Sequence, residues 1–249
     1  MKPVLAIAAL AAVCWLVPTA ASASFETGKA AYEAERYSDA LQIWEEAANA
    51  GDIRAQYHLA RMFEAGRGRI LKRDYPSAIR WYETAARRGH PEALYALGRM
   101  SENGTGMRQN YLLALQYYSL AVRYAELPRA HFALAQMYFH GRGVPQDYQK
   151  AIENYIAAAE RGHAPAQYVY GALLEQGWGV KQDLIQAYVW YALAAKEDPK
   201  VLEAISMNFN ARQAVETVRR KLNGHDLAKA ERRLKQWKPL QSRIQNPPE

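Results

Sequence analysis

The sequence predicts an all-α protein: a right-handed α/α superhelical solenoid of about five helical hairpins, followed by C-terminal capping helices. Two glycines separated by one residue recur four times, at Gly66 and Gly68, Gly104 and Gly106, Gly141 and Gly143, and Gly177 and Gly179. Alanines follow these pairs at intervals of 36, 37 and 36 residues, at Ala78, Ala114, Ala151 and Ala187. Such a period is typical of stacked helical hairpins. No segment alternates apolar and polar residues, so no sheet is expected.

Residues 1–23 are predicted to be a signal peptide. Lys2 precedes an apolar run from Val4 to Val17, and small residues then form an A-x-A cleavage pattern that ends at Ala23. The run is shorter than the roughly 20 apolar residues that span a bilayer. We therefore expect cleavage after Ala23 and export to the periplasm or beyond, rather than an integral membrane protein. The only cysteine, Cys14, lies in this segment, so the mature chain has no disulfide.

Residues 24–196 are predicted to form the solenoid. In the first helix of a unit, Ala55, Leu59 and Met62 recur at helical spacing, and a small residue follows the leucine position. The paired glycines then provide the turn, and an Asp or Asn caps the second helix. These predicted caps are Asp74, Asn110, Asp147 and Asp183. The opening unit, from Gly28 to Gly51, lacks the paired glycines and resembles a plain tetratricopeptide hairpin.

Residues 197–238 are predicted to be capping helices. Asp198 and Pro199 start one helix, which Asn223 and Gly224 end. Asp226 is expected to cap another, whose apolar stripe consists of Leu227, Ala230, Leu234 and Trp237. Terminal units of a solenoid need such a polar-backed cover. Residues 239–249 are expected to be a flexible tail.

The repeated motif resembles the Sel-one-like repeat family, which is related to tetratricopeptide repeats. One unit carries Ala130, Leu134, Ala135, Tyr138, Gly141, Gly143, Val144, Asp147, Lys150, Ala151, Tyr155, Ala158, Ala159 and Gly162 in the family's order. The resemblance covers about residues 25–196. It implies a helical solenoid that acts as a binding scaffold in envelope signalling, envelope assembly or host interaction.

No catalytic, cofactor-binding or metal-binding group is predicted, and the protein is not expected to be an enzyme. The paired glycines follow helices rather than strands, so they indicate turns instead of phosphate-binding loops. The six histidines show no i, i+4 pair and have no cysteine partners in the mature chain. Neither a G-x-S-x-G nor an H-E-x-x-H motif is present.

The candidate partner-binding residues lie on the predicted first helices, on the side opposite the buried stripe. They form an aromatic ladder with polar neighbours: Tyr57, Arg61, Tyr95, Arg99, Phe132, Gln136 and Tyr168. Aromatic and arginine side chains are common anchors of protein interfaces. Two alternatives remain open, since the same rings could stack on sugars or simply pack between neighbouring helices.

The formal charge of +7 is concentrated at the C-terminal end. Residues 24–217 contain 22 basic and 22 acidic side chains, whereas residues 218–249 contain nine basic and three acidic ones. Residues 218–243 are therefore a candidate contact for cell-wall glycan or an anionic envelope surface, with a solvated helix face as the alternative. Because export is expected, nucleic acid is not a predicted partner.

The predicted function is that of an exported scaffold that binds a protein partner through the concave face of the solenoid. The alternative is a protein that binds cell-wall glycan or peptide, with weak hydrolase activity.

Overall fold

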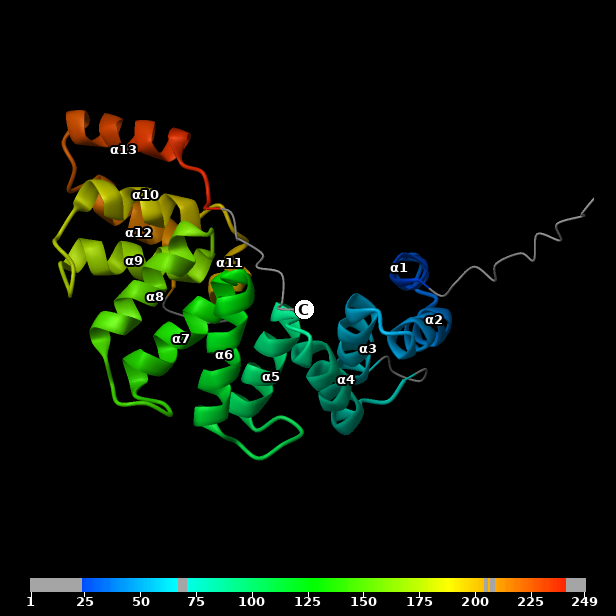
Figure 1. Ribbon diagram of the computed structural model, residues 1–249. Coiled ribbons are helices and arrows are strands. Elements are labelled where there is room, and N and C mark those ends of the chain that lie inside the picture. Colours follow the sequence, from blue (N-terminus) through cyan, green and yellow to red (C-terminus); the bar gives the residue numbers. More distant parts are fainter. Residues whose placement is uncertain (1–23, 67–70, 204–205, 207–208, 241–249) are drawn as a thin grey trace, which may run out of the picture.

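The computed structural model describes residues 24–66, 71–203, 206 and 209–240. In this part of the chain the regular structure is helical throughout, and the helices stack in a curved array from α1 to α13 (Figure 1). The predicted all-α solenoid is therefore confirmed. The predicted signal peptide, Gly68 and residues 241–249 lie outside the described residues.

Ten of the helices pair into five consecutive hairpins, and each hairpin contacts the next. The pairs are α1 (Phe25–Glu33) with α2 (Tyr37–Asn49), α3 (Ile53–Ala65) with α4 (Tyr75–Arg87), α5 (Pro91–Asn103) with α6 (Tyr111–Ala125), α7 (Pro128–His140) with α8 (Tyr148–Glu160), and α9 (Ala164–Gln176) with α10 (Leu184–Ala194).

The second helices of the repeats begin at the predicted caps. The side chains of Asp74, Asn110, Asp147 and Asp183 each accept a hydrogen bond from the backbone N–H three residues later, at 2.9 to 3.1 Å. Such a bond satisfies one of the amide groups that a helix start leaves without an intrahelical partner.

Close packing within the hairpins depends on the small residue after the leucine position. Gly98 on α5 lies against the ring of Tyr118 on α6, and a Cβ atom at Gly98 would come within 2.6 Å of that ring. Gly171 meets Tyr191 in the same way, at 3.0 Å. A larger residue at either position would separate the two helices of the hairpin.

The second glycine of a pair brings its loop onto the preceding hairpin. Gly143 has a φ of +74°, and a Cβ there would lie 2.7 Å from the backbone carbonyl carbon of Tyr111, at the start of α6. The G-x-G motif is therefore both a turn and a contact between neighbouring units.

Three helices follow the hairpins: α11 (Pro199–Glu203), α12 (Ala211–Arg219) and α13 (Gly224–Gln236). The prediction of one continuous helix up to residue 222 is wrong, because α11 ends early and Asn210 caps a separate α12 by accepting from the Gln213 N–H at 3.0 Å. The prediction that Asp226 caps the last helix is also wrong. Asn223 is the cap, and it accepts from the Asp226 N–H at 2.9 Å.

The end of the described chain is attached to the solenoid. Ala230 is buried, and Leu227, Leu234 and Trp237 pack on the same core cluster, as the stripe predicted. Beyond α13 the N–H of Leu240 donates to the carbonyl of Glu160 at 2.8 Å, and Pro239 lies against Gly162. The tail predicted to begin at residue 239 is thus held in place at its first two residues.

Candidate functional site

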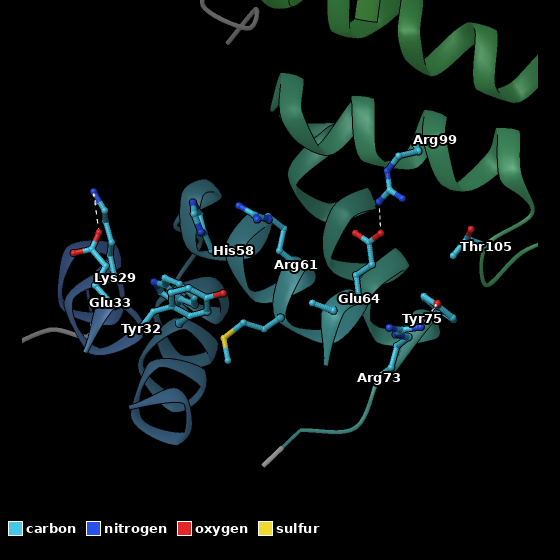
Figure 2. A pocket seen from close by; sticks show the side chains of 13 residues that line it. Lys29, Tyr32, Glu33, His58, Arg61, Glu64, Arg73, Tyr75, Arg99 and Thr105 are labelled. Carbon is cyan, nitrogen blue, oxygen red and sulfur yellow. Dashed lines mark hydrogen bonds and ion pairs between the residues drawn. The ribbon is translucent and has the colours of Figure 1, made fainter. Parts of the chain in front are cut away.

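A groove of about 680 Å³ lies between the first three hairpins. Its lining side chains come from α1 to α5 and from the loops after α3 and α5 (Figure 2). These residues are Lys29, Tyr32, Glu33, Trp44, His58, Arg61, Met62, Glu64, Ala65, Arg73, Tyr75, Arg99 and Thr105. Six of these side chains are charged at neutral pH: Lys29, Glu33, Arg61, Glu64, Arg73 and Arg99.

The groove has an apolar base made by the first two hairpins. Trp44 and Met62 are each only 1% exposed, and the ring of Tyr32 lies 5.5 Å from that of Trp44. Trp44 is fixed because its indole N–H donates to the carbonyl of Phe25 at 3.1 Å. A buried indole with a satisfied N–H gives this end of the groove a rigid wall.

Glu64 connects two hairpins at the other end of the groove. Its carboxylate accepts from the hydroxyl of Tyr82 at 2.7 Å and forms an ion pair with Arg99 on α5. Burial and the hydrogen bond to Glu64 raise the pKa of Tyr82, so this phenol stays protonated and continues to donate. Glu64 and Arg99 therefore neutralise each other, as the dashed line in Figure 2 marks.

The histidine of the groove is neutral at physiological pH. His58 contacts the rings of Phe25, Trp44 and Tyr57 at centroid distances of 4.9 to 5.2 Å. Burial, together with the smaller effects of the positive charges of Arg61, Lys29 and Arg54, lowers its pKa to about 4.

Two of the sequence-predicted residues, Arg61 and Arg99, meet in this groove. The other candidates do not line it. Gln136 lies on α7, where its side-chain oxygen is 3.1 Å from Nε2 of His140.

The aromatic ladder packs against neighbouring helices along the array. Each ring contacts a tyrosine on the second helix of its own hairpin, in the pairs Tyr57 with Tyr82, Tyr95 with Tyr118, Phe132 with Tyr155, and Tyr168 with Tyr191. Each also contacts a group that follows its own hairpin in the sequence, and these groups are His90, Arg129, His163 and Phe209. Phe132 is only 8% exposed. This placement agrees with the packing alternative, and a role of these rings in partner binding stays a prediction.

Several groove residues could not be found from the repeat pattern. Lys29, Tyr32 and Trp44 belong to the first hairpin, which lacks the paired glycines. The sequence does contain a pattern that could have identified Glu64. Glutamates recur at its repeat position as Glu102 and Glu175, and both accept from tyrosines at the repeat position of Tyr82.

The basic C-terminal residues lie on and beside α12 and α13, far along the array from the groove (Figure 1). Lys221 pairs with Glu175 at 2.6 Å, and Arg219 pairs with Glu216 at 3.7 Å. Part of this positive charge is therefore balanced by neighbouring carboxylates.

The described part of the chain has no metal-binding cluster and no membrane-spanning helix. In that part of the chain no group of three or more histidine, cysteine, aspartate or glutamate side chains is placed to hold a metal ion. No helix there is long and apolar enough to cross a membrane.

Similar proteins share the hairpin repeat. The Sel1 repeat family model matches residues 53–90, 91–123, 128–163 and 164–199, which correspond to the second to fifth hairpins. A Sel1 repeat protein from Oxalobacter formigenes is 23% identical, with a TM-score of 0.62 over 86% of this chain and 100% of that one. A protective antigen of uropathogenic Escherichia coli with an SLR fold is also 23% identical, with a TM-score of 0.50 over 81% of this chain and 48% of the other.

No curated protein matches the sequence. The structural neighbours establish the fold, and the four matched repeats account for more than half of the chain. The chain belongs to the Sel1 repeat family, whose members are repeat scaffolds associated with protein–protein interaction.

Proposed function

We propose that this protein is an exported scaffold that binds a segment of a partner protein in the groove between its first three hairpins. The observation that carries the proposal is the groove itself, because it draws side chains from five successive helices and is large enough for several residues of an extended peptide. Binding needs no covalent step, and the groove presents a rigid apolar base with charged side chains around it.

Export is supported by the fit between the predicted cleavage position and the first helix. Ser24 caps α1, with its hydroxyl accepting from the Thr27 N–H at 3.1 Å. Cleavage after Ala23 would leave this cap intact. Mass spectrometry of the mature protein from the native host is expected to find Ser24 at the N-terminus, and a chain that retains residues 1–23 would contradict export by cleavage.

The partner site is tested by photo-crosslinking in cells. A photoreactive amino acid replaces Ala65, which is exposed and lines the groove, and in a matched control it replaces Arg123, an exposed residue of α6 outside the groove. We expect one protein to be captured from position 65 and not from position 123, and the purified pair to bind in solution. Capture from position 123 alone, or none from position 65, would exclude the groove as the binding site.

A further inference from the structure

The groove contains more positive than negative charge. Its lining includes four cationic side chains, Lys29, Arg61, Arg73 and Arg99, and two carboxylates, Glu33 and Glu64. His58 adds no charge at neutral pH. Its pKa of about 4 is itself lowered in part by Arg61 and Lys29, after burial, so the positive field reaches the interior of the groove.

The two carboxylates already have partners. Glu64 is held by Tyr82 and Arg99, and Glu33 lies 3.8 Å from Lys29 on the same helix. Two of the four cations, Lys29 and Arg99, are therefore paired with these carboxylates.

Arg61 and Arg73 remain without a carboxylate. Both are exposed, and neither forms an ion pair with any residue in the described part of the chain. The guanidinium of Arg61 lies 5.9 Å from the ring centre of Tyr57, and that of Arg73 donates to the hydroxyl of Tyr75 at 3.1 Å. Figure 2 shows Arg61 between His58 and Glu64, and Arg73 beside Tyr75. An arginine fork matches the geometry of a carboxylate better than any neutral group does.

We propose that the groove selects an acidic peptide segment, whose carboxylates pair with Arg61 and Arg73 while an apolar side chain packs against the half-buried ring of Tyr32. This inference rests on the proposed function and names the chemistry of the partner segment. The excess of two positive charges suits a short peptide with a few carboxylates. A nucleic acid or a lipid surface would need a far more extended basic face.

The test uses the mature chain and two fluorescent peptides of eight residues. One probe contains four glutamates, one tyrosine and one leucine, and the other has glutamine in place of each glutamate. Fluorescence anisotropy measures the Kd of each probe at 50 mM and 300 mM salt. We expect the glutamate probe to bind about tenfold or more tightly than the glutamine probe at low salt, and to lose this preference as salt screens the charges.

Three variants locate the binding. Arg61→Gln and Arg73→Gln are each expected to weaken binding of the glutamate probe by about fivefold, because each removes one charge-assisted pair. Arg123→Gln, in an exposed helical position outside the groove, is the control and is expected to leave the Kd unchanged. These three variants, and the Arg61→Gln, Arg73→Gln double variant, are compared with the parent protein by circular dichroism to verify that the helical fold is retained.

The outcomes separate this inference from the proposed function. Equal binding of the two probes, or full binding by the Arg61→Gln, Arg73→Gln double variant, would overturn the selection of acidic segments. If the photo-crosslinker at position 65 still captures a partner in that case, the groove remains the binding site and only the proposed preference for acidic segments is wrong. Displacement of the probe by millimolar inorganic phosphate would reduce the site to a general anion site and would also overturn the inference.

Discussion

At the residue scale, the hairpins depend on a few positions where a side chain is absent. Gly98 is the clearest, because the ring of Tyr118 occupies the space that a Cβ would take. Tyr118 is itself 2% exposed and donates to Glu102 at 2.8 Å, so the ring is held from both ends and has little freedom to move aside.

Gly98→Ala is therefore expected to destabilise the protein by about 2 kcal/mol, although alanine is normally the better helix former. The matched control is Gly224→Ala in the first turn of α13, where nothing lies within 4 Å of the added atom. Urea unfolding followed by circular dichroism gives both free energies of unfolding. Equal values for the two variants would show that the ring of Tyr118 yields more easily than its contacts indicate.

The binding residues were harder to predict than the packing residues, and the reason is physical. The small residue at Gly98 and the caps recur because every unit has the same local problem to solve, so their pattern is visible in the sequence. The groove instead combines the particular side chains of unlike hairpins, such as Lys29 and Arg73, which no period connects. The aromatic ladder is regular in the sequence for the same reason as the caps, because each of its rings makes an equivalent packing contact in its own hairpin.

At the element scale, two histidines take the role that aspartate or asparagine has elsewhere. His90 caps α5 and His163 caps α9, with each Nδ1 accepting a backbone N–H, from Ala93 at 3.2 Å and from Ala166 at 3.4 Å. A protonated Nδ1 cannot accept a hydrogen bond. Burial lowers the pKa of both histidines to about 4, with a smaller contribution from His58 at His90 and from the positive charge of Arg129 at His163.

The free energy of unfolding is therefore expected to fall as the pH falls from about 6.5 to about 4. In this range the unfolded chain binds protons at these histidines and the folded chain does not, so stability is complete above pH 6.5 and decreases below it. The double variant His90→Asn, His163→Asn keeps a capping side chain at both positions, but asparagine does not titrate. Between pH 4 and 6.5 the slope of its free energy of unfolding against pH should be smaller than that of the parent protein by about 1 kcal/mol per pH unit or more. His225→Asn, on the exposed face of α13, is the control. Identical pH slopes for the double variant and the parent protein would contradict this assignment.

The boundaries of the elements were predictable wherever a cap and a repeat coincided. Asp183 illustrates this, since its position relative to the paired glycines identified the start of α10. The break after α11 was not predicted. Phe209, which follows the break, stacks on Tyr168 with the ring centres 4.5 Å apart, and this contact has no counterpart in the repeat pattern. A contact that occurs at only one place in the molecule produces no repeated pattern in the sequence.

At the scale of the whole molecule, neighbouring hairpins are joined by different chemistries. Ion pairs connect Glu26 with Arg54, Glu64 with Arg99, and Glu102 with Arg142, while Glu175 pairs with Lys221 of the C-terminal helices. At the interface between the fourth and fifth hairpins, Phe139 occupies the repeat position of Glu64, Glu102 and Glu175, and its ring lies 5.8 Å from that of Trp178. Added salt should therefore weaken the interfaces that contain ion pairs and leave the interface between the fourth and fifth hairpins largely unaffected.

The hydrogen bond from Leu240 to Glu160 has a mechanical consequence. It ties the C-terminal end to α8, whereas the first hairpin is held only by its neighbour. Under tension between Ser24 and Leu240, the first hairpin should therefore detach before the others and lengthen the chain by about 100 Å. Its departure removes Lys29, Tyr32 and Trp44 from the groove, so in an optical trap a bound acidic peptide should leave with this first step. A peptide that stays bound after the first unfolding step would contradict this order. If the order holds, the protein releases its ligand when it is pulled.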